Sequence, residues 1–226
     1  IGAQFKGDQP VDQQTIAAGL RAGVTAPRHW SGAARNWDAL DAKADALAAI
    51  AAAQGPTDSL QVVAEAPSWY HPGRSGSLKL GNKSVAWFGE IHPRILAAFD
   101  IKDSVVGFEI DLGMLPPMKA KTSKAKGAFR PAALQAVERD FAFVVDSSVS
   151  ADALLRAAKN ADKALITQVS LFDVYEGQHM EPGKKSLAIQ VTLQPTDKTL
   201  TDAEIEAVAA KLVEAVVKAT GGTLRS

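Results

Sequence analysis

The sequence contains no cysteine among its 226 residues. Without a thiol, the chain cannot form a disulfide, a cysteine-based zinc site or a thiolate nucleophile, and this composition fits a reducing compartment such as the cytoplasm. Its four histidines are scattered and lack the spacing of metal ligands, so we expect no metal site. These absences exclude cysteine catalysis and predict no cysteine-based or histidine-based metal centre.

Long apolar runs and net charge are also absent. No segment approaches the roughly 20 apolar residues that span a bilayer, so we expect no membrane contact. The 25 basic and 25 acidic side chains cancel, and any contact with nucleic acid must therefore come from a local patch. The chain begins with Ile1 in strand-like sequence, without Met, and we expect it to be a piece of a longer polypeptide.

A hydrophobic content of 46% supports a substantial core, in one large domain or two smaller ones. The first half is predicted to be a mixed domain with mostly antiparallel strands, and its longer helix has Leu40, Ala44, Leu47 and Ala51 at helical spacing. We predict helices over 12–22, 37–54 and 90–99, strands over 60–64, 77–82, 84–89 and 105–112, and a loop over 67–76. Residues 27–32 are predicted to form a strand end or a turn, with Trp30 buried.

Residues 116–126 change character, with two prolines, four interleaved lysines and no apolar periodicity. This composition is typical of an exposed linker between domains. We therefore expect a first domain over 1–118, a linker over 119–131 and a second domain over 132–226.

The second domain shows the order strand, helix, strand, strand, helix, strand. Thr201 and Glu204 form a capping box at the start of the second helix, and Gly221 ends it. This order is the split βαβ pattern of ferredoxin-like folds, in which two helices cover one face of an antiparallel sheet. The fold class is thus α+β, with an antiparallel sheet domain followed by a ferredoxin-like βαββαβ domain.

Strand alternation predicts which side chains lie on the uncovered face of that sheet. Leu187, Ile189, Val191 and Leu193 must face the helices, which places Ser186 on the other side. The same argument turns Phe172 and Val174 inward, and Asp173, Tyr175 and Ala142 outward. Strict alternation would also bury Gln168 and Ser170, so we expect a bulge or a late strand start there.

The hairpin around residues 172–186 is therefore a candidate nucleic-acid surface, although a solvated tip in which Asp173 pairs with Lys184 or Lys185 is the simpler alternative. Arg139 and Asp140 are also compatible with a structural ion pair. The group His71, Arg74, Glu90 and His92 lies among prolines and glycines, which favours hydrogen-bonded turns, and we expect no catalytic residue in this chain.

Several motifs together carry a resemblance to a known family. They are Arg139-Asp140-Phe141-Ala142, the segment 172–177, the segment 183–188, Thr199-Leu200-Thr201-Asp202, and Leu224-Arg225. In this combination and order they resemble the ferredoxin-fold anticodon-binding domain of bacterial phenylalanyl-tRNA synthetase β subunits. In the first half, 37–43, 71–75 and 89–93 resemble the synthetase-like domain of the same subunit. The segment 37–43 departs from the usual pattern, which more often has a further aromatic residue and a glycine.

The resemblance implies the C-terminal part of the β subunit of an enzyme that attaches phenylalanine to its tRNA, with an incomplete class II synthetase-like domain over 1–118. The family works as an alpha2beta2 heterotetramer, in which the alpha subunit holds the active site and uses ATP and Mg²⁺, while the related domain of the β subunit is catalytically silent. We accordingly expect no cofactor in this chain and no ATP-binding segment in residues 1–118. The family's anticodon contacts carry over to Ala142, Asp173, Tyr175 and Ser186, and Arg139, Lys184 and Lys185 are candidates for tRNA phosphate.

Two other functions fit the same fold. Ferredoxin-like sheets also serve as ligand-sensing or protein-interaction modules, because a fold does not determine a function. A general RNA-recognition domain would need aromatic Gly-Phe motifs on its sheet, and the sequence lacks them. Binding of phenylalanine tRNA separates the first of these alternatives from the anticodon-binding hypothesis.

Overall fold

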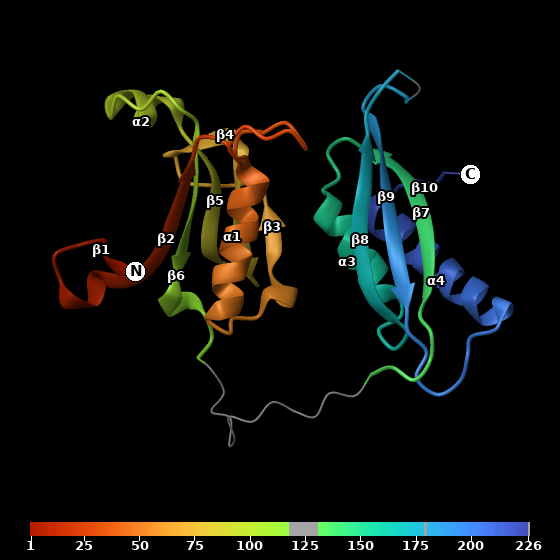
Figure 1. Cartoon of the computed structure of the whole chain (residues 1–226). Coiled ribbons are helices and arrows are strands. Elements are labelled where there is room, and N and C mark those ends of the chain that lie inside the picture. Colours follow the sequence, from red (N-terminus) through yellow and green to blue (C-terminus); the bar gives the residue numbers. More distant parts are fainter. Residues whose placement is uncertain (118–130, 179, 226) are drawn as a thin grey trace. The chain divides into compact units, whose positions relative to one another are not determined.

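The computed structural model describes residues 1–117, 131–178 and 180–225. The chain divides into two units, Ile1–Lys124 and Ala125–Ser226. Each unit is built on its own antiparallel sheet (Figure 1). Of the predicted linker 119–131, only Pro131 lies within the described residues.

The first unit is a six-stranded sheet in the order β1-β2-β6-β5-β4-β3. One face of this sheet packs against α1, and the cluster between them includes Ile50, Leu78 and Ile110, which are fully buried. The elements are β1 Gly2–Phe5, β2 Gln13–Ala22, α1 Ala39–Ala52, β3 Gln61–Val63, β4 Tyr70–Leu80, β5 Lys83–Ile91, α2 Pro93–Ala98 and β6 Val105–Asp111, with 3-10 turns at Pro10–Asp12, Thr57–Ser59 and Leu112–Met114.

The prediction of a helix over 12–22 is wrong, because this segment is strand β2. Its alanines suit a helix, but β2 pairs with β1 on one side and with β6 on the other, and this pairing overrides local propensity. Gly19 fits the strand because an added Cβ would lie 2.6 Å from the ring of Phe108. A glycine inside an apparent helix was the available signal that the segment was misread.

Three smaller predictions in the first unit are also wrong. Trp30 is 92% exposed and not buried. The loop predicted over 67–76 belongs largely to β4, which is irregular between Tyr70 and Ser75, where proline and glycine interrupt the pairing with β5. Helix α1 buries Ala42, Ala46 and Ile50, whereas Leu40 of the predicted stripe is 70% exposed.

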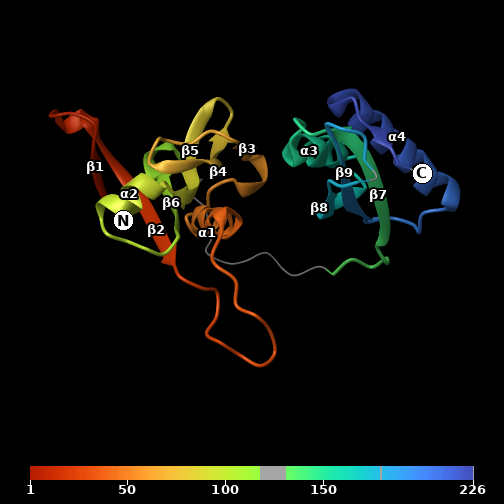
Figure 2. The same ribbon diagram turned by 90° about the horizontal axis from the view of Figure 1, so that it is seen from above.

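The second unit has the predicted ferredoxin-like order, which is confirmed element by element. The elements are β7 Val137–Asp146, α3 Ala151–Ala161, β8 Ile166–Tyr175, β9 Lys184–Leu193, α4 Asp202–Thr220 and β10 Thr223–Leu224. The sheet order is β10-β7-β9-β8, with all neighbours antiparallel. Viewed from above, α3 and α4 lie on one side of this sheet (Figure 2).

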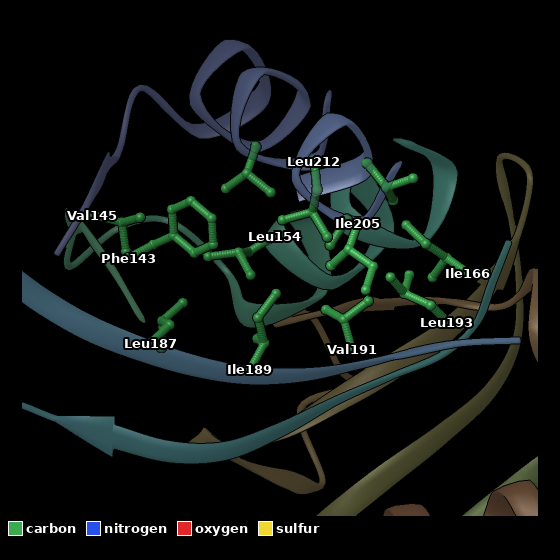
Figure 3. Close-up of a cluster of buried hydrophobic side chains, with 13 residues drawn as sticks. Phe143, Val145, Leu154, Ile166, Leu187, Ile189, Val191, Leu193, Ile205 and Leu212 are labelled. Carbon is green, nitrogen blue, oxygen red and sulfur yellow. The ribbon is translucent and has the colours of Figure 1, made fainter. Parts of the chain in front are cut away.

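The core of the second unit lies between the sheet and these two helices. Leu187, Ile189 and Val191 project from β9 toward the helices, where they meet Leu154 and Leu212 (Figure 3). The predicted capping box of α4 is confirmed at Thr201 and Glu204, and α3 is capped by Ser150, which accepts a hydrogen bond from the Ala153 amide. Gly221 ends α4 with a φ of 66°, a left-handed conformation that glycine adopts without strain.

Candidate nucleic-acid interface

The face of the four-stranded sheet opposite the helices can be read from the strand register. Residues paired across an antiparallel sheet project on the same side. Ser186 of β9 pairs with Val144 of β7 and with Tyr175 of β8, and Thr223 of β10 pairs with Val144. These four side chains therefore form one row across the sheet. We call this side, away from α3 and α4, the open face; no helix of residues 131–225 packs on it.

A second row lies beside the first. Ala188 of β9 pairs with Ala142 of β7 and with Asp173 of β8. The amide of Arg225 donates to the carbonyl oxygen of Ala142 at 2.7 Å, which continues the pairing of β10 with β7 by one residue. Because Leu224 pairs with Phe143, Arg225 follows on the side of Ala142. The open face therefore brings together Ala142, Asp173, Tyr175 and Ser186, as the alternation predicts.

A bulge at Phe172 makes this arrangement possible. Leu171 pairs with Ile189 and Asp173 pairs with Ala188, so Phe172 is the extra residue, and the predicted bulge is confirmed, although it lies two residues beyond Ser170. The prediction that Phe172 points toward the helices is wrong, because Phe172 is the bulge residue and is 58% exposed. Val174 pairs with the core residue Leu187 and therefore lies on the helix side as predicted, although it is 51% exposed and outside the core cluster.

Tyr175 has a defined position at the end of β8. Its ring lies against the backbone of Gly177, where an added Cβ would come within 2.6 Å of the phenol oxygen and 2.7 Å of Cζ. The phenol has no hydrogen-bond partner among the described residues, and the side chain is half-buried. An aromatic ring held by glycine, with a free hydroxyl at its tip, is suited to stacking on a ligand.

The middle of the open face carries small side chains. Ala142, Ala188 and Ser186 occupy neighbouring positions on the two central strands, and Ser186 is only 4% exposed. Val144 and Tyr175 flank it on either side. A planar group can approach this floor closely, because no long side chain stands on these three positions.

Asp173 stands at the rim of this floor on β8. It is exposed and makes no ion pair or hydrogen bond within the part of the chain that the structure describes. Pairing with Lys184 or Lys185 is therefore not what the structure shows. The Lys184 ammonium lies 2.9 Å from the Asp146 carboxylate, and this hydrogen bond, followed by the charge of Asp146, raises the pKa of Lys184. The Lys185 ammonium donates instead to the carbonyl oxygen of Ser147 at 2.8 Å.

Only one of the three predicted phosphate ligands lies on the open face. Lys184 lies two residues before Ser186 on β9, so its side chain projects to the same side of the sheet, the open face. Arg139 pairs with Val191 and Lys185 pairs with Val145, and both of these valines are core residues. Arg139 and Lys185 thus project toward the helix side of the sheet.

Arg225 is the cation that sequence reasoning missed. It is exposed, and its side chain has no ion pair among the described residues. The signal was available, since the same alternation that placed Ala142 outward, extended to the short strand after Gly222, would have placed Arg225 on the open face.

Comparison with known proteins bears on what this face does. Residues 132–225 match the family model of the ferredoxin-fold anticodon binding domain, and residues 1–112 match that of the phenylalanyl tRNA synthetase beta chain CLM domain. The chain is 63% identical over 225 residues to the phenylalanine-tRNA ligase beta subunit of Paramagnetospirillum magneticum. It is 58% identical to the protein of the same name from Rhodospirillum rubrum and 51% identical to that from Bradyrhizobium diazoefficiens.

The chain belongs to the phenylalanyl-tRNA synthetase β-chain family. Each of these three alignments covers the whole chain but only 28% to 29% of the relative, so the chain spans less than a third of the curated relatives it matches. The two matched regions correspond to the two sheets: the CLM region contains β1 to β6, and the anticodon-binding region contains β7 to β10.

Several polar residues of the CLM region are hydrogen-bonded or ion-paired with one another. The Glu109 carboxylate accepts hydrogen bonds from Trp69 Nε1 at 2.6 Å and from the Tyr70 hydroxyl at 3.0 Å. Arg74 and Glu90, from the predicted turn cluster, form an ion pair of 2.8 Å. Within the described residues, no group of three or more acidic or histidine side chains is arranged to hold a metal ion. No helix described here is long and apolar enough to cross a membrane.

Proposed function

We propose that this chain is the tRNA-binding part of a phenylalanine-tRNA ligase β subunit and that its open face binds the anticodon of phenylalanine tRNA. The observation that carries the proposal is the gathering of Tyr175, Asp173, Ala142 and Ser186 on one uncovered sheet face. The family match of residues 132–225 to an anticodon-binding domain supports it independently.

Each side chain has a distinct part in this proposal. Tyr175 stacks on an unpaired base, a contact worth about 1–3 kcal/mol per base. Asp173 accepts hydrogen bonds from the Watson-Crick edge of a guanine, which carries adjacent N–H donors. Ser186 and Ala142 form the floor that lets the base approach, and the Ser186 hydroxyl can donate or accept at its centre.

Lys184 is the phosphate contact that we retain, because it shares the open face. Arg139 and Lys185 project to the helix side of the sheet and are therefore not placed to contact RNA on the open face. The ion pair of Lys184 with Asp146 leaves it less available than a free lysine, so its contribution to affinity is the smaller one.

The rest of the proposal concerns the whole enzyme. We infer that the chain acts in the cytoplasm, within an alpha2beta2 assembly whose alpha subunit activates phenylalanine with ATP and Mg²⁺. We assign no catalytic step to the residues of this chain. The hydrogen bonds around Glu109 and the Arg74–Glu90 pair support a structural role for the CLM region, since these groups are partnered within the fold.

The test is the binding of phenylalanine tRNA to the 226-residue chain and its variants. Replacing Tyr175 or Asp173 with Ala should raise the Kd about tenfold, which corresponds to about 1.4 kcal/mol. Val174→Ala is the matched control, since Val174 lies between them on the same strand, is 51% exposed and projects to the other side. Equal binding by all variants would contradict the proposal and favour a protein-interaction module.

A further inference from the structure

A depression of about 460 Å³ lies at the β10 end of the open face. Its volume is within the range of about 300–1,000 Å³ that small-molecule sites occupy. Val144 and Thr223 line it from β7 and β10, Met180 and Glu181 line it from the connection between β8 and β9, and Lys184 lines it from the start of β9. Gly221 and Arg225 complete the lining.

This depression is continuous with the row of residues described above. Val144 and Thr223 belong to the same row as Ser186 and Tyr175, and Arg225 belongs to the row of Ala142 and Asp173. Since neighbouring strands lie about 4.8 Å apart, the outer strands β8 and β10 are separated by roughly 14 Å. A base that stacks on Tyr175 therefore leaves the depression free for another part of the same RNA strand.

The two cations that line the depression, Lys184 and Arg225, differ in how free they are to bind a ligand. Lys184 is hydrogen-bonded to Asp146, and Glu181 adds a second negative charge that also raises the pKa of Lys184. Arg225 has no such partner among the described residues. Arginine presents five N–H donors in a planar fork that matches phosphate, and it stays charged at any physiological pH.

The backbone holds Arg225 in place. Its amide is hydrogen-bonded to the Ala142 carbonyl, and β10 is aligned on β7 by the turn at Gly221 and Gly222. Gly222 is buried there, and an added Cβ would lie 2.6 Å from Cγ1 of Val145. The guanidinium therefore projects from a fixed point of the sheet, which reduces the ordering cost of binding.

We propose that this depression is a second nucleotide subsite, in which Arg225 binds a backbone phosphate of the RNA segment whose base stacks on Tyr175. Val144 and Met180 offer apolar contact to the sugar or base of that nucleotide. The inference rests on the proposed function and extends it, because it assigns a residue and a surface that lie beyond the Asp173, Tyr175 and Ser186 positions.

The experiment measures the Kd of the 226-residue chain for an anticodon stem-loop RNA at several salt concentrations. Arg225→Ala should weaken binding about tenfold, since a charge-assisted hydrogen bond is lost. It should also reduce the slope of log Kd against log salt by about 0.7, the value of one phosphate contact on single-stranded RNA. Arg139→Ala is the matched control, an exposed arginine of the same sheet on the helix side.

A scan that replaces each RNA phosphate in turn with an uncharged methylphosphonate identifies the contact. At one phosphate the loss should not add to that of Arg225→Ala, which is the signature of a direct interaction. The subsite is overturned if the losses are additive at every phosphate, or if Arg225→Ala leaves the salt slope unchanged. The proposed function still stands in that case, provided that Tyr175→Ala weakens binding. If neither variant affects RNA binding, both the subsite and the proposed function are overturned.

Discussion

The two sheets of this chain differ in whether a tyrosine and a carboxylate are hydrogen-bonded within the fold. In the first unit, Glu109 lies on the sheet face away from α1 and accepts two hydrogen bonds, from Trp69 and Tyr70. In the second unit, Asp173 and Tyr175 lie on the face away from the helices and have no partner within the described residues. A polar group that is partnered inside the fold contributes to stability, whereas an exposed group without a partner is available to a ligand.

The tyrosines show this difference most directly. Tyr70 is 2% exposed, and burial, followed by the nearby Glu109 carboxylate, raises the pKa of its phenol. Tyr175 is half-buried, its ring lies against Gly177, and its hydroxyl has no partner in the described parts of the chain. The same residue type is thus a structural element in one sheet and a candidate stacking surface in the other.

The largest expected effects come from replacing one core leucine in each unit with alanine. Leu78 and Leu212 are both buried, at 0% and 1% exposure, and replacing either with Ala should lower the free energy of unfolding of its unit by about 2–5 kcal/mol. Hydrogen exchange resolved by unit measures this. We expect Leu212→Ala to reduce RNA binding and Leu78→Ala to leave it unchanged. Faster hydrogen exchange in both units after either substitution would contradict the expectation that each core stabilises its own unit.

Removing one hydroxyl from each tyrosine should have an intermediate effect. Tyr70→Phe removes a hydrogen bond to a carboxylate and should lower the free energy of unfolding of the first unit by about 1.5–3 kcal/mol. Tyr175→Phe should leave the stability of the second unit unchanged, because its hydroxyl is unpaired. Chemical denaturation measures both, and a similar loss in the two variants would contradict the contrast between the sheets.

Gly177→Ala should have the smallest effect of these variants, and it should change RNA binding without changing stability. The new methyl group would displace the Tyr175 ring, which is a movable side chain, so the free energy of unfolding should stay nearly constant. RNA affinity should fall by less than the 1–3 kcal/mol of a full stacking contact. Parallel melting curves and binding titrations test this. Unchanged affinity would show that the position of the ring is not important for binding.

Much of the second unit could be predicted because its local signals agree with one another. The capping residues Ser150 and Thr201, the apolar stripe of α4 and the alternation of β9 all specify the same fold. The first unit was harder. β2 is rich in alanine, and its pairing with β1 and β6 makes it a strand, for which Gly19 is a weak local signal.

The residues of the candidate site could be predicted where the alternation of a strand was applied to them. Period two correctly separated Asp173 and Tyr175 from Val174, since each strand presents alternate residues to one side. Applied to the basic residues, it would have excluded Lys185 and Arg139 and added Arg225. Charge and motif alone make Arg139 and Lys185 candidates, and charge does not indicate the face of a sheet.

The measurement that tests the central claim most directly compares two tRNAs. The 226-residue chain is titrated with phenylalanine tRNA and with a copy in which only the three anticodon bases are replaced. We expect the replaced copy to bind more weakly, and we expect this preference to shrink in Asp173→Ala and Tyr175→Ala. Equal affinity for the two tRNAs in the unaltered chain, despite measurable binding, would contradict the assignment of the open face to the anticodon.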